Sequence, residues 1–432
     1  MENIQSKSSL INKFLSYKQR INNSDTLNYF FIFYAFSIPI SGKITHLVFT
    51  LIIILWILEG DIKNKIISSL KNKFVQALFF FFILHILWIF SSDNIPFALA
   101  TIKNSLLLLY PIIYITSIKK EFTFKILNGF IYAMMFSEIT SYLIHFQIIP
   151  PIYNATIHDP VPFALSHTTY SLYLGLSIGL MLFISLNSKT TKILKIIYIL
   201  FFITASINIF LIASRFGFLL YFISILIVLI YIYKKNIKKI FFLGIILTSA
   251  GYYLAYTFSQ TFHNRIDQTM KSTQLVIEQK NFSTSLGIRV GNWYYSFFII
   301  KDNFLFGVGD GDQISEFQKI VKKHKDPAEK ALLHNLQNGI HSEIMDIFTK
   351  FGFIGFILYL NIFFQLSKTK PKNTIFDILK FLLIFIFLLS AIQGGAIVMA
   401  VKDLGKIFTL LSILIIINSF STEKKGKTSS LS

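Results

Sequence analysis

The sequence contains no cysteine among its 432 residues. Disulfide bonds, thiol catalysis and cysteine-ligated metal sites are therefore excluded. Acidic residues are also scarce, because 21 Asp and Glu stand against 41 Lys and Arg. The first 26 residues are polar and basic, and they lack a short apolar core that ends at a small-residue cleavage site. We therefore expect no removed signal peptide, and we expect the first apolar segment to remain as an anchor.

Apolar residues dominate the composition. They make up 54% of the chain, which contains 48 Phe and 20 Tyr and has a mean hydropathy of +0.62. A water-soluble domain cannot bury that much apolar surface in one core. Runs of roughly 14 to 23 apolar residues recur between Leu27 and Phe420, and each is about long enough to cross ~30 Å of hydrocarbon as a helix. We predict an all-α polytopic membrane protein with about 12 transmembrane helices.

The net charge of +20 raises the alternative of nucleic-acid binding. The lysines, however, form short clusters between the apolar runs and no basic stripe with aromatic residues, so we expect no nucleic-acid partner. The clusters precede the first run and follow every second one, near Lys18, Lys65, Lys119, Lys192, Lys238, Lys370 and Lys425. The short connections between them, such as residues 91–96 and 150–162, carry no Lys or Arg. The positive-inside rule then places both termini in the cytoplasm.

One connection, residues 259–351, is much longer than the others, and span parity places it outside. Its own lysines do not contradict this, because long translocated loops largely escape the charge rule. The first two spans, residues 27–40 and 44–58, are short, so they could form a hairpin that does not fully cross the membrane. Such a hairpin would leave the orientation of all later spans unchanged. We therefore expect a cytoplasmic segment (1–26), helices 1 to 9 (27–258), an outer helical loop (259–351) that would be periplasmic in a cell envelope, helices 10 to 12 (352–420) and a cytoplasmic tail (421–432).

The long loop carries helix signals of its own. Residues 283–300 open with Ser and Thr that can cap a helix, and apolar residues follow at helical spacing. Residues 312–325 show an amphipathic pattern. Residues 326–339 contain Asp326 as a predicted N-cap, a proline in the first turn and Gly339 as the stop. We therefore predict three helices in this loop, and we expect the amphipathic one to pack on the membrane domain.

Two histidines lie near the end of this loop. His334 falls inside the third predicted helix beside leucines, which indicates a packing residue. His341 follows the Gly339 break, at the predicted start of the next helix, where the helix dipole disfavours the imidazolium and leaves a neutral ring that can accept a proton. The chain re-enters the bilayer there, so a lipid-linked substrate can reach it. The alternative for His341 is an interfacial side chain packed at the membrane surface.

Two arginines are further candidates. Arg215, in "ASRFGFL", is predicted at the outer end of a helical hairpin, where a guanidinium at membrane depth costs about 2.5–3.5 kcal/mol and therefore suggests an anionic partner. Arg289 and Trp293 are four residues apart, so they project from one helical face, and the guanidinium is free to bind an anion. The alternatives are an Arg215 that reaches the lipid headgroups and an Arg289 that is simply exposed on the loop.

Other polar residues receive no specific role. "FGVGDGD", residues 306–312, lacks the Lys-Ser/Thr of a P-loop and the ligand spacing of an EF-hand, so it is predicted to be a tight turn. Lys103, Glu138 and His167 lie in or near predicted spans, where polar side chains can line a cavity.

With these residues in view, the chain resembles the O-antigen ligase and polymerase superfamily. "HSEIMDIFTKFGFIG" has a histidine followed by two glycines at the spacing of one of its motifs, "TSLGIRVGNWYYSFFIIKDNFLFGVGDG" resembles its loop pattern, and "ASRFGFL" resembles its Ser-Arg hairpin. The resemblance covers roughly residues 205 to 360. In two departures, Ser342 replaces the usual asparagine and Phe216 the usual small residue; both concern the acceptor pocket more than the reaction class.

The resemblance implies inverting glycosyl transfer from an undecaprenyl-diphosphate-linked glycan to an acceptor hydroxyl on the periplasmic side, without a metal, a cofactor or a nucleotide sugar. Arg215 and Arg289 would bind the diphosphate, and His341 would accept the proton of the incoming hydroxyl. Lipid A core is the first acceptor that we expect, as in lipopolysaccharide biosynthesis, because a single large outer loop resembles the ligases. A growing glycan (polymerase) and a protein hydroxyl (oligosaccharyltransferase) are the alternatives within the family. Outside the family, the alternative is a polytopic transporter. Such a transporter is expected to contain an internal repeat, and we find none in the sequence. In both cases membrane lipids surround the protein.

Overall fold

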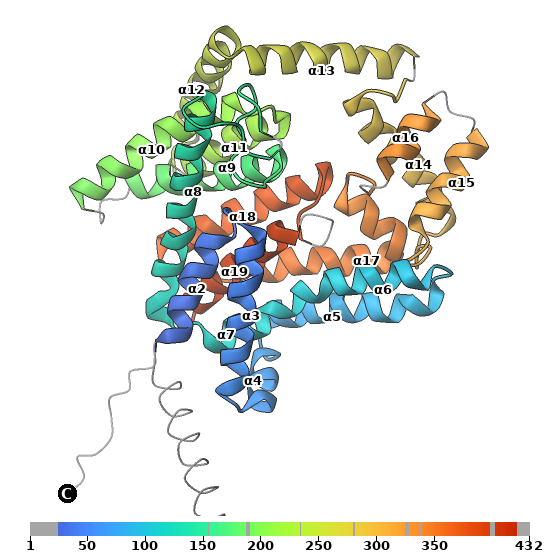
Figure 1. The fold of residues 1–432 in the computed structure, drawn as a ribbon, viewed down its shortest axis with the longest axis horizontal. Coiled ribbons are helices and arrows are strands. Elements are labelled where there is room, and N and C mark those ends of the chain that lie inside the picture. The colour runs from blue at the N-terminus through green and yellow to red at the C-terminus, as the bar shows by residue number, and fades with distance from the viewer. Residues whose placement is uncertain are drawn as a thin grey trace, which may run out of the picture.

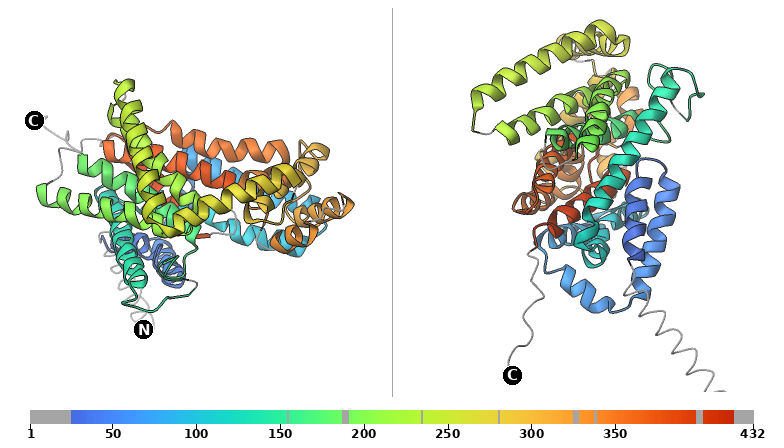
Figure 2. Two further views of the ribbon diagram at one scale, coloured as in Figure 1. Left: turned by 90° about the horizontal axis from the view of Figure 1, so that it is seen from above. Right: turned by 90° about the vertical axis from the view of Figure 1, so that its left-hand side faces the viewer.

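The structure is a computed structural model that describes residues 25–153, 155–186, 191–233, 235–279, 281–324, 328–336, 339–397 and 402–420. Within these ranges the chain is helical, apart from one isolated β-bridge between Thr156 and Asp159. The prediction of an all-α fold is confirmed. Figures 1 and 2 show the helices as one bundle from which the segment between α12 and α17 projects.

Eight helical segments of the described residues are long and apolar enough to cross a membrane, or nine if the bent pair α3 and α4 is one span. The predicted count of about 12 is not confirmed. The eight segments are Lys73–Ser91 (α5, Lys73–Leu87, with a following 3-10 turn), Ile95–Ser117 (α6, Ile95–Ser105, and α7, Tyr110–Ser117), His167–Leu186 (α9), Lys192–Leu211 (α10), Arg215–Tyr233 (α11), Lys238–Phe258 (in α12, Ile237–Phe258), Glu343–Ser367 (α17) and Thr374–Gln393 (α18). The other helices are α2 (Thr26–Ser37), α3 (Gly42–Leu58), α4 (Ile62–Ser69), α8 (Thr123–His145), α13 (Gln260–Gln279), α14 (Ser285–Asp302), α15 (Gln313–His324), α16 (Glu329–Asn335) and α19 (Lys402–Ile417).

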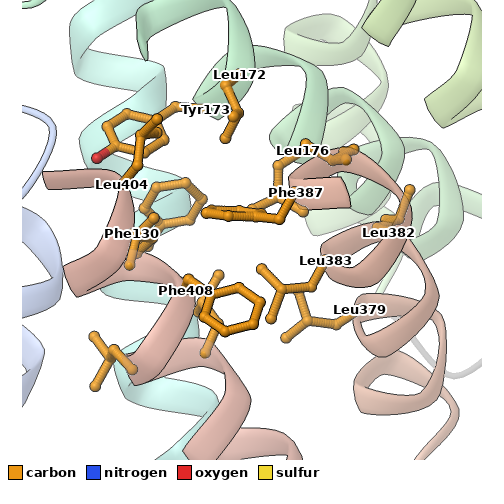
Figure 3. Close-up of a cluster of buried hydrophobic side chains, with 14 of the residues drawn as sticks. Phe130, Leu172, Tyr173, Leu176, Leu379, Leu382, Leu383, Phe387, Leu404 and Phe408 are labelled. Atoms are coloured by element: carbon orange, nitrogen blue, oxygen red, sulfur yellow. The ribbon is translucent and has the colours of Figure 1, made fainter. Parts of the chain in front are cut away.

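The apolar core of the bundle surrounds α9. This helix packs against α10, α11 and α18, and most of its residues are buried. Figure 3 shows side chains from α8, α9, α18 and α19 meeting in this core, with Phe387 beside Phe408 at a ring-centroid distance of 5.0 Å. A Cβ atom at Gly179 would lie 2.8 Å from Leu382, so the glycine lets α18 approach closely. Small residues at helix contacts serve the same purpose in other membrane proteins, where dispersion rather than hydrophobicity drives helix association.

The segment between α12 and α17 forms a second unit, which we call the loop domain (α14, α15 and α16). Its core is separate from that of the bundle and is formed by Phe282, Tyr295, Phe317, Leu332, Ile340 and neighbouring apolar residues. Figure 1 shows α13 leading from α12 across to this domain. The predicted helices at 283–300 and 312–325 are α14 and α15. In α16 the N-cap is Ala328, which makes no side-chain cap, and the predicted cap residue Asp326 lies outside the described residues.

The predicted turn at residues 306–312 attaches the loop domain to α17. Val308 N–H donates to the Thr349 carbonyl at 2.9 Å, and Phe353 N–H donates to the Phe304 carbonyl at 2.8 Å. This pairing uses backbone groups that α17 leaves free at a kink, where Gly352 has φ +61° and ψ −157°. A Cβ atom at Gly352 would lie 2.4 Å from the backbone of Leu305, so only glycine fits there.

Buried charges join the same turn to the bundle. Asp310 accepts a hydrogen bond from, or forms an ion pair with, Nδ1 of His85 at 2.8 Å, and it lies 3.6 Å from Nζ of Lys350. Lys350 also pairs with Asp346 at 2.9 Å. The carboxylate of Asp312 accepts from the backbone N–H groups of residues 93 and 94 at 2.7 and 3.0 Å. Because Asp310 is fully buried, these bonds fix the loop domain on α5, α6 and α17.

We expect Asp310→Ala to destabilise the protein by about 1–3 kcal/mol, because the substitution leaves the buried His85 ring without its partner and leaves Lys350 with Asp346 alone. The measurement is the chemical denaturation midpoint in detergent. Asp302→Ala is the control, because Asp302 is exposed at the end of α14. Equal midpoints for the two variants would contradict this role for Asp310.

Candidate functional site

Arg215 is the first residue of α11, and the connection from α10 positions it. Ala213 N–H donates to Oδ1 of Asp159 at 2.9 Å, so the loop after α8 fixes the connection. The Ser214 hydroxyl accepts from Gly217 N–H at 3.1 Å, in the manner of an N-cap. A Cβ atom at Gly217 would lie 2.7 Å from Ser171, so α11 begins in close contact with α9. Arg215 is therefore fixed at a helix end that borders the apolar bundle.

Arg289 lies in the second turn of α14, in the loop domain. The Thr284 hydroxyl caps this helix by accepting from Gly287 N–H at 3.0 Å. Nη1 of Arg289 donates weakly to the Ser285 carbonyl, at 3.3 Å. Among the described residues, Nε of Arg289 and Nε of Arg215 are both buried without a hydrogen-bond partner. Buried N–H groups of this kind usually have an acceptor, so an anionic ligand would complete both.

Arg215 and Arg289 line one cleft at the junction of the bundle and the loop domain. The full lining is His167, Thr168, Ala213, Ser214, Arg215, Phe216, Arg265, Ser285, Arg289 and Gln393. It brings together α9, α11, α13, α14 and the end of α18. The lining holds three guanidinium groups and, within the described part of the chain, no carboxylate. Such a cleft favours a polyanion, and above all a phosphate group that can accept paired N–H bonds.

Arg265 is a cleft residue that the motifs did not indicate. It lies in the second turn of α13, outside the motifs that indicated Arg215 and Arg289. A compositional signal was nevertheless present. The chain has only four arginines, Arg20, Arg215, Arg265 and Arg289, in a sequence that otherwise uses lysine. Three of the four lie in this cleft, and a preference for guanidinium over ammonium is typical of phosphate recognition.

His341 lies beside the cleft and is not part of its lining. The helix α17 begins at Glu343, two residues after the predicted start at His341. Ser342 is its N-cap, and His341 precedes this cap with φ +56°. The Ser342 hydroxyl accepts from Met345 N–H at 3.4 Å, so serine can replace the family's asparagine as a capping residue. Asn292, three residues after Arg289 on α14, donates to the Ile340 carbonyl at 3.1 Å. One helix therefore positions both Arg289 and the backbone next to His341.

A buried carboxylate fixes the other side of His341. Glu343 accepts from Ala396 N–H at 2.7 Å, from Ile397 N–H at 2.9 Å and from the Tyr359 hydroxyl at 2.8 Å. The Glu343 N–H donates in turn to the Gly394 carbonyl at 2.7 Å. Because Gln393 precedes this loop and lines the cleft, the bonds join the His341 segment to the end of α18.

The electrostatic environment keeps His341 neutral. Burial lowers its pKa below the ordinary 6.5, and the nearby positive charge of Arg289 lowers it further. Burial also lowers the pKa of Arg289, which nevertheless remains protonated, because the ordinary pKa of an arginine lies far above neutral pH. At neutral pH the site thus pairs an uncharged imidazole, which can accept a proton, with a guanidinium that can bind an anion.

The structure also places the polar residues that had no assigned role. His167 lines the cleft, and its Nδ1 lies 3.9 Å from Oδ2 of Asp159. Glu138 is buried within α8 and Lys103 is exposed on α6, and neither lines the cleft. His334 is exposed, so the prediction that it packs is wrong: on this short helix Leu332 and Leu336 fill the core of the loop domain.

The fold and this cleft define a polytopic helical membrane protein with a cationic site between its bundle and an attached domain. Residues 200–360 match the family described as O-Antigen ligase. This match confirms the resemblance that was inferred from the motifs. The match contains Arg215, Arg265, Arg289 and His341. No curated protein matches the chain.

We expect Arg289→Gln to raise the pKa of His341, because the substitution removes a nearby positive charge that disfavours the imidazolium. The measurement is an NMR titration of ring-labelled histidines in detergent, with His341 assigned from His341→Gln. Lys271→Gln removes an exposed charge from α13 and should leave the His341 titration unchanged. An equal His341 pKa in wild type and Arg289→Gln would show that the two groups do not interact.

Proposed function

We propose that the protein transfers a glycan from undecaprenyl diphosphate to an acceptor hydroxyl. The family match supports glycosyl transfer of the O-antigen ligase type. The single observation that carries the finer proposal is the cleft, in which Arg215, Arg265 and Arg289 converge from three helices without a carboxylate among the described lining residues. A diphosphate matches this arrangement better than a neutral sugar or a carboxylate, because it offers acceptor oxygens to more than one guanidinium.

The reaction requires charge stabilisation at the leaving group. The acceptor oxygen forms a bond to the anomeric carbon, and the bond from that carbon to the diphosphate oxygen breaks. The diphosphate takes the electron pair and gains negative charge. Arg215 and Arg289, with Arg265 as a third cation, would stabilise that charge more in the transition state than in the bound donor, and this difference lowers the barrier.

The acceptor hydroxyl must lose its proton during the same step. His341 would accept it, because its imidazole is neutral at pH 7 and lies beside Arg289, close to where the diphosphate would bind. The chain itself then supplies both the electrostatic and the proton-transfer groups, so neither a nucleotide sugar nor a metal ion is needed in this scheme. A single displacement at the anomeric carbon inverts its configuration.

Lipid A core is the acceptor that we propose first, with the cleft on the periplasmic side of the inner membrane. One compact loop domain borders the cleft, and the described part of the connection between α8 and α9 has only turns and one β-bridge. A polymerase, which must bind a second lipid-linked glycan, more often has two sizeable outer loops. A growing glycan and a protein hydroxyl remain the second and third acceptors to test.

The test of this proposal is a transfer assay with purified protein and a lipid-diphosphate glycan as donor. Lipid A core, additional donor and a hydroxyl-containing protein are offered separately as acceptors. We expect a glycosylated lipid A core with inverted anomeric configuration. Longer glycan chains without lipid A would instead identify a polymerase. If the donor is consumed with none of the three acceptors present in the product, glycosyl transfer to these acceptors is contradicted.

In that assay Arg215→Ala, Arg289→Ala and His341→Ala should each lower kcat/KM by ~10² or more, because each removes a group that acts on the transition state. Lys271→Ala, in an exposed position on α13, is the control and should retain wild-type activity. Wild-type rates in all three variants would remove the proposed site.

The pH profile gives an independent check. Because burial and Arg289 lower the pKa of His341, we expect kcat/KM to be constant near pH 7 and to fall only as the pH decreases through a value below 6.5, where the imidazole becomes protonated. The free-enzyme profile is the relevant one, since a bound diphosphate would shift the histidine in the opposite direction. An acid limb above pH 6.5 would show that another group controls the reaction.

A further inference from the structure

A polar pocket of about 610 Å³ lies at a lysine-rich end of the bundle and shares no described residue with the arginine cleft. It is enclosed by α4, the segment that leads into α5, the end of α7 and Phe420. Figure 1 shows α4 at this end, where it turns from α3 by 112°. The lysine clusters of residues 63–73 and 119–125 lie in the connections that meet here. The positive-inside rule assigns such an end to the cytoplasmic leaflet.

The short helix α4 is amphipathic, and its apolar side chains are the exposed ones. Ile62 and Ile66 are each 37% exposed, and Ile67 is 49% exposed. The polar side of the same helix, with Lys65 and Ser68, lines the pocket. A helix that faces water has the reverse arrangement. The orientation is that of an interfacial helix, whose apolar side chains lie among the acyl chains, so the pocket on its polar side opens at the level of the lipid headgroups.

Two lysines supply positive charge to this pocket. The Lys65 ammonium donates to Glu59 at 2.7 Å and to a backbone carbonyl at 3.1 Å, which leaves one of its three N–H groups for a further acceptor. Lys71 is exposed and forms no ion pair with any residue in the described ranges. Asp61 is the one carboxylate in the described lining, and it accepts from the Asn64 amide at 2.7 Å. The pocket therefore offers two ammonium groups to an anion.

We propose that this pocket binds the headgroup of an anionic phospholipid, whose acyl chains lie along the exposed apolar side of α4. The lipid phosphate accepts from Lys65 and Lys71, and the serine hydroxyls of α4 are partners for the hydroxyl groups of the headgroup. A soluble phosphate compound would meet the same lysines, but only a lipid also covers Ile62 and Ile66 on the same helix. Basic pockets at the cytoplasmic side of membrane proteins bind anionic lipids. The site is independent of the proposed glycosyl transfer.

Native mass spectrometry of the purified full-length protein in a neutral detergent tests this site. The protein is titrated with phosphatidylglycerol, which is anionic, and with phosphatidylcholine of the same acyl chains, which has no net charge. We expect one phosphatidylglycerol to bind with a lower Kd than phosphatidylcholine. Lys71→Glu should raise the Kd of phosphatidylglycerol about tenfold, because it replaces an attractive charge at the pocket with a repulsive one.

Lys73→Glu is the matched control, because Lys73 is exposed two residues further along the chain and does not line the pocket. This variant has the same net charge as Lys71→Glu and should retain the wild-type Kd. Equal weakening in the two variants would show that the basic end attracts anionic lipids diffusely, and it would overturn the pocket assignment. Equal Kd values of the two lipids for the wild type would contradict an anionic-lipid site.

A competition experiment separates a lipid from a soluble ligand. Glycerol 1-phosphate carries the phosphate without acyl chains and should not displace phosphatidylglycerol at the same concentration, whereas displacement would overturn the lipid assignment. If Lys71→Glu fails to fold, Ser68→Phe replaces it, because this change fills the pocket from an exposed position of α4 without altering the charge. A rise of about tenfold in the Kd of phosphatidylglycerol supports the site, and a wild-type Kd in Ser68→Phe contradicts it.

Discussion

The mutual repulsion of three arginines beside an apolar bundle is the constraint on which the rest of this structure depends. Arg215, Arg265 and Arg289 would separate in a flexible protein, because their charges repel and water solvates each of them better alone. No ion pair between an arginine and an acidic residue occurs in the described part of the chain. The fold must therefore hold the three groups together by other means.

Carboxylates outside the cleft lining provide that restraint without neutralising the cleft. Asp159 binds the backbone of the α10–α11 connection, Glu343 binds the loop after α18, and Asp312 binds the amides before α6. Asp310 pairs with the side chains of His85 and Lys350. In a chain with few acidic residues, these acids stabilise the walls of the site and leave the guanidiniums available for a ligand. The cost of holding three cations together would be recovered when an anion binds.

Local sequence patterns predicted the membrane class, α14, α15 and the two motif arginines, because each depends on helical spacing or a short motif. The number of spans was harder to predict. The helix α2 has only 12 residues, and α8 is long enough to cross a membrane but less apolar than the eight candidate spans. Arg265 and Gln393 were missed since only tertiary packing brings them to Arg215. His341 was placed at the helix start, whereas Ser342 takes the cap. No pattern in a single sequence indicates that residues 304–309 pair with a kinked α17.

The order in which the cleft residues occur along the chain has a consequence for biosynthesis. His167, Arg215, Arg289 and Gln393 come from segments that leave the ribosome at widely separated times, and Gln393 precedes only the last helix. A nascent chain has no complete anion site until almost all of it has been synthesised. If the ligand is the lipid diphosphate proposed above, a half-inserted protein would not bind it prematurely, and a truncated product that lacks α18 would not compete for it.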